Sequence, residues 1–295
     1  MRVHVVGVGK MGLPMARHLG TGGHSVGVSD PDPQRLALAG EAGLAQRPWS
    51  EAALAGVDVV LSSLPHDQAL RQVGDAVARW GRPGLLFIDT STVSPQASAE
   101  VARSCEAAGV AHLRCTVSGN NQMAEAAQLT VMGSGPASAW ERALPLLRLL
   151  GPTQLYLGEG EQARLMKLVV NLMIAQTSAM LAEALALGRK GGLEGEAMWR
   201  VFTASAVASP ILRAKADALA ARDFTPTFTV HQMIKDLDLI LGAAQALQVP
   251  LAQTALTRQW MSAAVAQGDG GEDYAAILKV VERSAGLGAD GTIAP

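Results

Sequence analysis

Short apolar segments alternate with amphipathic segments over the first half of the chain. The apolar segments are rich in β-branched residues and cover residues 3–7, 24–29, 57–64, 84–89, 110–115, 128–133 and 153–158. Helical spacing of apolar residues is found between them, in residues 11–20, 31–40, 66–80 and 94–109. Strands that alternate with helices in this way predict a parallel, doubly wound α/β sheet.

The pattern becomes helical after residue 160. One long helix is expected over residues 162–190, where Gly191 and Gly192 give a stop signal. Further helices are expected over residues 196–203, 210–221, 230–247, 251–267 and 275–285, and the tail 286–295 is expected to be loose. The sequence therefore predicts two domains, 1–160 for dinucleotide binding and 161–295 all-helical for substrate binding and oligomerisation.

Composition narrows the possible partners. The chain of 295 residues is long enough for two domains, and only 17% of its residues are charged, against roughly 25% in an average soluble domain. A surface so poor in charge indicates that another subunit covers part of it. The formal net charge of −2 provides no basic stripe, so we expect neither nucleic acid nor a membrane surface as a partner.

Two further features bear on the cellular compartment. Cys105 and Cys115 have neither metal-ligand spacing nor the density of a disulfide scaffold, which favours reduced thiols in the cytoplasm. The apolar stretch 168–188 is long enough to span a bilayer, but polar residues interrupt it, and we interpret it as a buried helix.

The segment GVGKMG, residues 7–12, follows the first strand and opens the first helix. Gly7 suits the tight turn, Gly9 lets the backbone approach a pyrophosphate, and Gly12 lets helix and strand pack closely. Lys10 and Met11 lie in the same loop, and all five residues are predicted to bind the cofactor.

The second strand ends at Asp30, where a carboxylate accepts from a ribose hydroxyl and repels a 2′-phosphate. We therefore predict NAD rather than NADP.

Ligands of such sheets lie beyond the carboxyl ends of the strands. In DTSTVSP, Ser94 and Pro95 form an ordinary helix start. For Ser91 and Thr92 two interpretations are equally plausible from the residues alone: they are free to contact the nicotinamide side of the cofactor, or they belong to a hydroxyl-rich turn.

Lys167 and Asn171 interrupt the apolar run LMKLVVNLMIA and share one face of the long helix. From the helical pattern alone, a snorkelling Lys167 and a catalytic Lys167 are equally plausible. Oxidation of an alcohol needs a base, and burial among apolar neighbours (Leu165, Met166, Leu168 and Val169) would lower the lysine pKa from about 10.4.

With GVGKMG, DTSTVSP, TVSG, Lys167 with Asn171, and IKDLDL in order along the chain, the sequence resembles the β-hydroxyacid dehydrogenases, which include 3-hydroxyisobutyrate dehydrogenase and tartronate semialdehyde reductase. The resemblance covers residues 2–285. It implies a Rossmann-like N-terminal domain, an all-α C-terminal domain joined to it by the long helix, a homodimer or homotetramer, and NAD-dependent reversible oxidation of a small β-hydroxy acid.

The resemblance also assigns roles to residues. Lys167 matches the catalytic general acid/base, and Asn171 matches an asparagine that contacts the substrate. Ser118 and Gly119 match the loop that holds the substrate carboxylate. Matches to cofactor-binding residues are Leu64, Pro65, Thr92 and Lys235.

The sequence departs from the family pattern at CTVSGNNQ, where Asn120, Asn121 and Gln122 replace glycine-rich backbone. We expect these amides to bind the substrate, and we expect the substrate to differ from the usual one of the family. Val170 also stands where relatives often have a second asparagine. For Lys235 and Asp236 a solvated helix face is a rival interpretation, with Asp236 supporting a helix start.

Other functions are kept open. One is a cofactor-binding sensor or interaction module that has lost its chemistry at CTVSGNNQ. Another is an NADPH-dependent imine reductase of the same architecture. A decarboxylating sugar-acid dehydrogenase is disfavoured because no basic cluster for a substrate phosphate is found. The six histidines are scattered, and no metal is expected.

Overall fold

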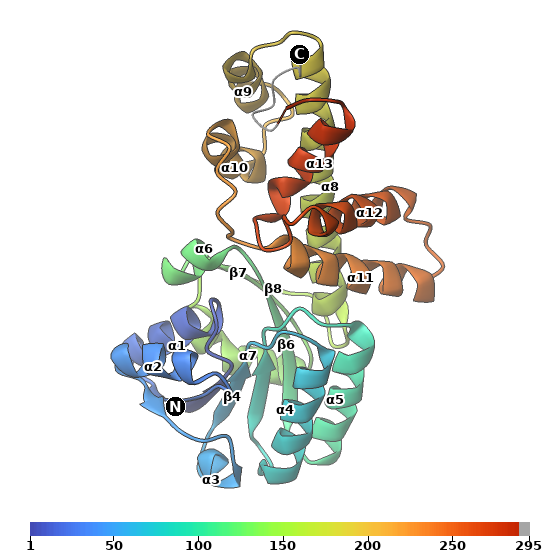
Figure 1. Cartoon of the computed structure of the whole chain (residues 1–295). Coiled ribbons are helices and arrows are strands. Elements are labelled where there is room, and N and C mark those ends of the chain that lie inside the picture. The colour runs from blue at the N-terminus through green and yellow to red at the C-terminus, as the bar shows by residue number, and fades with distance from the viewer. Residues whose placement is uncertain (289–295) are drawn as a thin grey trace. The chain divides into compact units, whose positions relative to one another are not determined.

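The computed structural model describes residues 1–288, so most of the tail 286–295 lies outside the described residues. The chain divides into two compact units, Met1–Leu168 and Val169–Pro295. Figure 1 shows a sheet flanked by helices in the first unit and helices throughout the second. The α/β domain and the all-α domain predicted from the sequence are confirmed.

The first unit contains one sheet of eight strands, in the order β3-β2-β1-β4-β5-β6-β7-β8. The strands are β1 (Arg2–Val6), β2 (Ser25–Ser29), β3 (Ala45–Gln46), β4 (Val59–Ser62), β5 (Leu86–Asp89), β6 (Ala111–Ser118), β7 (Thr130–Ser134) and β8 (Thr153–Tyr156). All seven expected strands are present. The two-residue β3 was not expected, because it is too short to show a period.

The prediction of an entirely parallel sheet is wrong at one pair. β6 and β7 are antiparallel, whereas the other neighbouring pairs are parallel. Parallel neighbours need a connection of about a dozen residues or more. Only residues 119–129 connect β6 to β7, so the chain turns back beside the strand that it has left.

Helices cover both faces of this sheet (Figure 1). They are α1 (Gly12–Thr21), α2 (Pro33–Glu41), α3 (Glu51–Leu54), α4 (Asp67–Trp80), α5 (Pro95–Ala107), α6 (Asn121–Glu125) and α7 (Ala137–Leu147). Alternate residues of the strands face different cores: Val5 packs in the core of α1, α2 and α7, and Val60 packs in the core of α4 and α5. Burial on both faces explains why these strands are continuously apolar.

The expected start of α5 is confirmed. Ser94 is the N-cap, and its hydroxyl accepts from the backbone N–H of Ala97 at 3.1 Å, while Pro95 occupies the first turn. Ser94 also donates to Asp67 at 2.5 Å. Ser94 therefore serves the helix start, as the sequence indicated.

The long helix α8 (Gln162–Lys190) covers the expected range and continues from the first unit into the second. The helices of the second unit are α9 (Gly195–Ala204), α10 (Pro210–Ala220), α11 (Val230–Ala246), α12 (Ala252–Ala266), η1 (Tyr274–Ala276) and α13 (Ile277–Ser284). The sequence predicts the domain boundary near residue 160. The compact units divide after Leu168 because the first turns of α8 pack with the sheet.

By length and composition α8 could cross a membrane. Its most apolar window is 33% buried, so the expectation of a buried helix is wrong for most of this window. Asn171 and Gln176 in the middle of the helix make polar contacts with Asp236 and Thr254. Neighbouring helices of the second unit thus satisfy these polar groups of α8.

Candidate functional site

The three glycines of the glycine loop differ in the space around them and in the reason that each is a glycine. Gly7 has φ +87°, and a Cβ at this position would come within 2.3 Å of the carbonyl oxygen of Ser63. A Cβ on Gly12 would come within 1.9 Å of the Gly7 oxygen, whereas a Cβ on Gly9 would meet no atom within 4 Å. Gly7 and Gly12 are therefore required by the turn and by packing, while Gly9 borders a space that no atom of residues 1–288 fills.

Asp30 lies directly after β2 and is tied to the glycine loop. Its Oδ2 accepts from the backbone N–H of Val8 at 2.8 Å, and its Oδ1 accepts from the N–H of Asp32 at 2.9 Å. The carboxylate is half-buried and held at the carboxyl edge of the sheet. The open space at Gly9 and the fixed carboxylate both fit a dinucleotide with a free ribose hydroxyl.

The other cofactor candidates lie on loops at this edge. Lys10 is exposed and Met11 half-buried just before α1, and Leu64 is half-buried and Pro65 exposed just after β4. Thr92 is half-buried in the turn that follows β5. Contacts of these residues with a cofactor stay predictions.

Ser91 is not free, and its expected cofactor contact is corrected. Its side chain is 3% exposed, donates to Asp89 at 2.6 Å and accepts from the backbone N–H of Leu64 at 2.8 Å. Ser62 donates a further short hydrogen bond to Asp89. Ser91 therefore joins the loop after β4 to the turn after β5 instead of pointing into the site.

Arg164 is the main residue that sequence reasoning missed. It is 1% exposed, forms an ion pair with Asp89, and donates to the carbonyl oxygen of Ser91 at 2.6 Å. A lone arginine in an apolar helix gives no sign of a partner 75 residues away. Its position, three residues before Lys167, is the only sequence signal of its importance.

Lys167 is half-buried in α8, but its expected apolar wall is mostly absent from this chain. Leu165, Met166 and Val169 are 39%, 40% and 46% exposed, whereas Leu168 is 2% exposed. Helical geometry explains the difference, because only one of these four neighbours lies on the buried side. Of these four side chains only Leu168 is buried within the chain, and the proposed effect of the apolar neighbours on Lys167 stays a prediction.

Asn171 is held by a buried carboxylate of α11. Its amide nitrogen donates to Asp236 Oδ2 at 2.5 Å, and Lys235 Nζ lies 2.8 Å from Asp236 Oδ1 in an ion pair that lacks hydrogen-bond alignment. Asp236 is 1% exposed. It does not support a helix start, because α11 begins with a capping box of Thr229 and Gln232.

The bond to Asp236 also fixes the orientation of the Asn171 amide. A carboxylate only accepts hydrogen bonds, so the amide NH₂ must face it. The amide oxygen consequently points elsewhere as an acceptor. The Lys235 side chain is 34% exposed and forms an ion pair with the buried Asp236, so its contact with a cofactor and its place on a solvated helix face both stay open.

The loop after β6 is shaped by a glycine and a helix cap. Ser118 ends the strand and is half-buried, and Gly119 has φ +137°, a conformation that favours glycine. The side chain of Asn120 accepts from the N–H of Met123 at 2.9 Å and caps α6. Part of the hydrogen-bonding capacity of Asn120 is therefore used locally.

The remaining amides of this loop differ in exposure. Asn121 is half-buried, and its Oδ1 is buried without a hydrogen-bond partner in the described structure. Gln122 is exposed. A contact of Asn120, Asn121 or Gln122 with substrate stays a prediction.

Burial perturbs several titratable groups outside these loops. Burial raises the pKa of the Cys105 and Cys115 thiols to about 12, so both are unreactive at neutral pH. Burial, and then Arg47, lowers the pKa of His4 to about 4. Burial also holds the pKa of His112 well below its usual value. Among residues 1–288, no group of three metal-ligating side chains is found.

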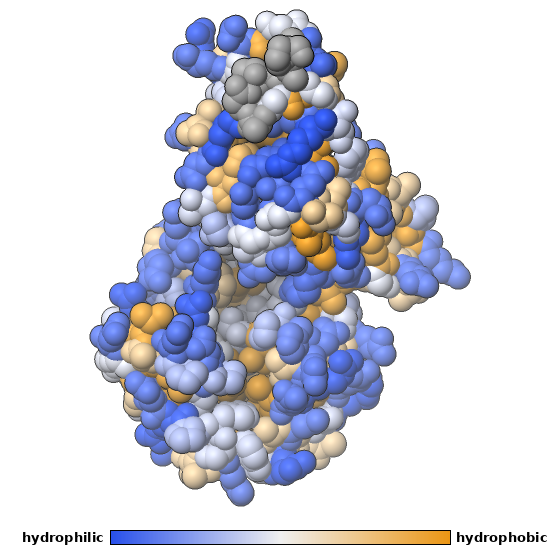
Figure 2. Space-filling view, viewed as in Figure 1, coloured by the Kyte–Doolittle hydropathy of each residue, from blue (hydrophilic) through white to orange (hydrophobic). Residues whose placement is uncertain are grey.

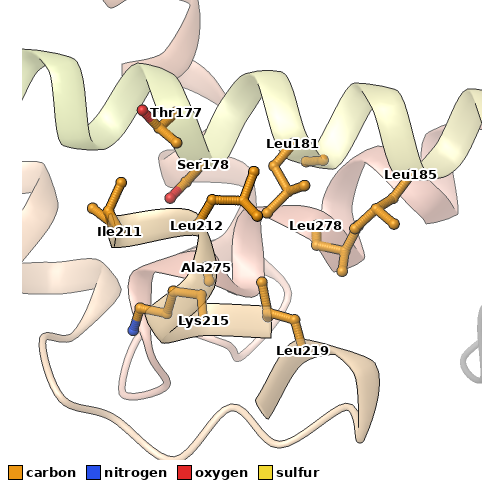
Figure 3. Close-up of a pocket in the computed structure, with 11 residues that line it drawn as sticks. Thr177, Ser178, Leu181, Leu185, Ile211, Leu212, Lys215, Leu219, Ala275 and Leu278 are labelled. Carbon is orange, nitrogen blue, oxygen red and sulfur yellow. The ribbon is translucent and has the colours of Figure 1, made fainter. Parts of the chain in front are cut away.

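A narrow pocket lies in the helical unit, where residues of α8, α10, η1 and α13 line it (Figure 3). Leucine, isoleucine and alanine side chains of α8, α10, η1 and α13 form most of its wall, and it holds little more than one water-sized group. Lys215 at its edge is committed to Asp273, with both carboxylate oxygens at 2.7 Å. The pocket is apolar packing space, and none of the predicted site residues lines it.

A mostly parallel doubly wound sheet, a glycine loop open at Gly9 and a fixed acid after β2 define a dinucleotide-dependent oxidoreductase. A family model described as the NAD binding domain of 6-phosphogluconate dehydrogenase matches residues 2–158. A second, described as NAD-binding of NADP-dependent 3-hydroxyisobutyrate dehydrogenase, matches residues 161–281. The chain belongs to the β-hydroxyacid dehydrogenase family.

Individual relatives agree with this assignment. The 2-(hydroxymethyl)glutarate dehydrogenase of Eubacterium barkeri is 30% identical over 99% of this chain and 98% of its own. The 3-hydroxyisobutyrate dehydrogenase of Pseudomonas aeruginosa is 33% identical over 93% of this chain and 96% of its own. The solved Mycobacterium tuberculosis 3-hydroxyisobutyrate dehydrogenase with L-serine has a TM-score of 0.88 and 29% identity, covering 95% of this chain and 99% of its own.

The protein is accordingly an NAD-dependent oxidoreductase that acts on a CH–OH group and reversibly oxidises small hydroxy acids. The NAD-binding N-terminal domain and the 3-hydroxyisobutyrate dehydrogenase-like architecture predicted from the sequence are confirmed.

Proposed function

We propose that the protein oxidises a small β-hydroxy acid to the corresponding semialdehyde or keto acid, with Lys167 as general acid/base. The single observation that carries the proposal is the arrangement on α8. Lys167 and Asn171 are one turn apart, and Arg164, just before them, attaches the helix to the carboxyl end of β5. This arrangement supports a base fixed beside the edge of the sheet where the cofactor binds.

In this proposal the Lys167 amine takes the proton of the substrate hydroxyl as the alcohol becomes a carbonyl. NAD, when bound, supplies the acceptor for the hydrogen that leaves carbon with its electron pair. The amide oxygen of Asn171, fixed by Asp236, orients the hydroxyl or the amine through a hydrogen bond. In the reductive direction the Lys167 ammonium returns the proton to the carbonyl oxygen.

The substrate carboxylate is assigned to the loop after β6. Ser118 and Gly119 provide a hydroxyl and a backbone N–H there, and the amides of Asn121 and Gln122 add polar groups beyond the usual family loop. The relatives act on substrates as different as 3-hydroxyisobutyrate and 2-(hydroxymethyl)glutarate, by their names. The polar loop favours a substrate with an additional hydrogen-bonding group.

The cofactor site is assigned to Gly7, Gly9, Gly12, Asp30 and Thr92, and further contacts to a second set: Lys10, Met11, Leu64, Pro65 and Lys235. Asp30 supports a preference for NAD over NADP, because a carboxylate repels a 2′-phosphate. Residues 1–160 serve as the dinucleotide-binding domain in this proposal, and residues 161–295 serve substrate binding and oligomerisation.

A homo-oligomer is supported by one stripe on α8. Met166, Met173, Met180 and Leu187 recur every seven residues and are 40%, 64%, 57% and 76% exposed. Figure 2 shows hydrophobic residues among the polar ones on the surface of the helical unit. A stripe with this spacing suits packing against a second copy. The cytoplasm suits two buried, reduced thiols, and cell fractionation would test it.

The test is an NAD-reduction screen over 3-hydroxyisobutyrate, glycerate, serine, threonate, sulfonated analogues and bulkier β-hydroxy acids, with NADP in parallel. On the best substrate, Lys167→Ala should lower kcat by about 100- to 10,000-fold, the usual contribution of a general acid/base. NADH binding, followed by fluorescence, should persist. Lys190→Ala, an exposed lysine at the end of the same helix, is the matched control.

Near-normal turnover in Lys167→Ala would contradict the mechanism. NADH binding without activity on any acid would favour a cofactor-binding module, and reduction of a cyclic imine with NADPH would favour an imine reductase. A KM that does not change in Asn121→Ala or Gln122→Ala would reduce these amides to scaffold.

A further inference from the structure

The start of α8 is attached to the sheet by polar contacts from both backbone and side chains. We call Glu161, Ala163 and Arg164 the α8 anchor. The N–H of Ala163 donates to the Ser134 hydroxyl of β7 at 3.1 Å, and its carbonyl accepts from the Thr116 hydroxyl of β6 at 3.0 Å. Both backbone groups of one residue are thus held by side chains of two neighbouring strands.

The two charged residues of the α8 anchor have opposite charges, and each forms an ion pair with a residue of one of two adjacent strands. Arg164 pairs with Asp89 of β5, and Glu161 pairs with Arg114 of β6. Asp89 and Arg114 are register partners across the two strands. A shift of α8 by one residue would misplace both pairs, so the arrangement specifies one position of the helix on the sheet.

Arg164 uses all three of its nitrogen atoms. Nη2 bonds to Asp89, Nη1 donates to the Ser91 carbonyl at 2.6 Å, and Nε donates to the Ser98 hydroxyl at 3.0 Å. A buried ion pair of this kind is weak evidence for stability, because its desolvation offsets most of the attraction. The planar guanidinium does fix geometry, since its donors point in set directions.

These partners lie next to residues of the proposed site. Ser91 accepts from the N–H of Leu64 and is followed by Thr92, so its position sets two proposed cofactor contacts. Lys167 lies three residues after Arg164, on a neighbouring position of the same helical face. One network thus connects the proposed base to the proposed cofactor loops within a single compact unit.

We propose that Arg164 is a positioning residue for the reaction: by binding Asp89 and the Ser91 carbonyl, it fixes the turn of α8 that carries Lys167 relative to the loops that hold the cofactor. The inference rests on the proposed role of Lys167. Arg164 itself touches neither substrate nor cofactor in this account, and it acts through the distance between base and reacting carbon.

The test begins with Arg164→Lys, which keeps a cation for Asp89 but loses the fork that reaches Ser91 and Ser98. We expect kcat to fall by roughly 100-fold, as for a displacement of about 1 Å in a reacting group. The dissociation constant of NADH should rise by a smaller factor than kcat falls, because the glycine loop is unaltered and only the contacts near Leu64 and Thr92 are displaced. The matched control is Arg222→Lys, which alters an arginine–carboxylate pair with Glu282 in the helical unit and should leave kcat unchanged.

A double-mutant cycle separates positioning from general damage to the fold. If Arg164 acts through Lys167, Arg164→Lys should not lower the residual turnover of Lys167→Ala any further. An equal loss in both backgrounds would overturn the proposal, and so would an unchanged kcat in Arg164→Lys. If Arg164→Lys fails to fold, the neutral pair Asp89→Asn with Arg164→Gln is used in the same cycle. Normal turnover of the single variant Lys167→Ala would instead refute the base itself.

Discussion

The glycine loop allows a sharp test, because the structure predicts opposite consequences for two neighbouring glycines. Gly9→Ala places a methyl group where no atom of the chain lies within 4 Å, and Gly9 is not among the positive-φ residues. The folded state of the Gly9→Ala variant should therefore be unstrained. Because alanine has less conformational freedom than glycine in the unfolded chain, the variant should be more stable by about 0.4–1 kcal/mol. Gly12→Ala places the methyl 1.9 Å from the Gly7 carbonyl oxygen, a backbone atom that cannot swing away. It should destabilise the fold by about 1–3 kcal/mol or more.

Cofactor affinity should show the reverse order. If the space at Gly9 belongs to the pyrophosphate, the new methyl overlaps the ligand at a cost of about 1–3 kcal/mol. That cost corresponds to about 5- to 150-fold in the dissociation constant of NADH. Gly9→Ala is therefore a folded enzyme that binds cofactor weakly.

The assay combines urea unfolding with a fluorescence titration of NADH. Gly195→Ala is the control, because a Cβ there also meets no atom within 4 Å but the residue begins α9 in the helical unit. It should stabilise the fold by a similar amount, about 0.4–1 kcal/mol, and leave the dissociation constant of NADH unchanged. Wild-type affinity in Gly9→Ala would refute the assignment of this space to the cofactor, and a larger loss of stability in Gly9→Ala than in Gly12→Ala would refute the packing argument.

Two further predictions concern acid stability and assembly. His4 has a pKa of about 4 in the folded state and about 6.5 in the unfolded state, so unfolding takes up a proton between these pH values. The contribution of His4 to the free energy of unfolding is therefore fully present above pH 6.5. This free energy falls by roughly 3 kcal/mol as the pH is lowered towards 4. Urea unfolding at pH 7 and pH 5 should show this fall, shallower in His4→Gln, and a flat wild-type profile would contradict it. In solution the protein should be a dimer or tetramer by light scattering. The double variant Met173→Glu with Met180→Glu should dissociate the oligomer. Val201→Glu alters another exposed apolar residue and should not. A wild-type protein that is monomeric at micromolar concentration would contradict the proposed packing of the stripe against a second copy.

Long periodic elements could be predicted from the sequence, and elements set by distant contacts could not. The helix expected over residues 162–190 and the seven strands follow from local spacing of apolar residues. α7 was not expected, and Pro145 inside it reads as a helix breaker. The antiparallel direction of β7 depends on the shortness of one connection, residues 119–129, and not on the spacing of apolar residues within the strand.

The site shows the same division. The tasks of Gly7, Gly9 and Gly12 could be assigned because a short motif carries its own geometry. The partners of Ser91 and Asp236 could not, because each is buried by residues far along the chain. A hydroxyl after a strand looks the same in the sequence whether it faces a ligand or, like Ser91, binds a neighbouring loop.

α8 explains why the surroundings of Lys167 were misjudged. Its buried side carries polar residues every seven positions, Arg164, Asn171 and Ser178, and its exposed side carries Met173 and Met180. A hydrophobic pattern assigns the methionine side to the core, which is the reverse of what the fold does. Each buried polar residue has a partner, since Arg164 binds Asp89, Asn171 binds Asp236 and Ser178 bonds to the Tyr274 hydroxyl.

This inversion is costly unless both sides of the helix have a use. Burying Arg164 and Asn171 stabilises the fold little, because their hydrogen bonds only offset desolvation. Exposing a row of methionines to water forgoes roughly 1.5–3 kcal/mol for each side chain that could have been buried. The two proposals made for this helix account for the two sides separately: the polar side fixes the catalytic groups, and the apolar side is buried by a second copy. If the methionine variants dissociate the protein while Arg164→Lys lowers kcat without changing the assembly, the two sides of α8 are independent in function as they are in chemistry.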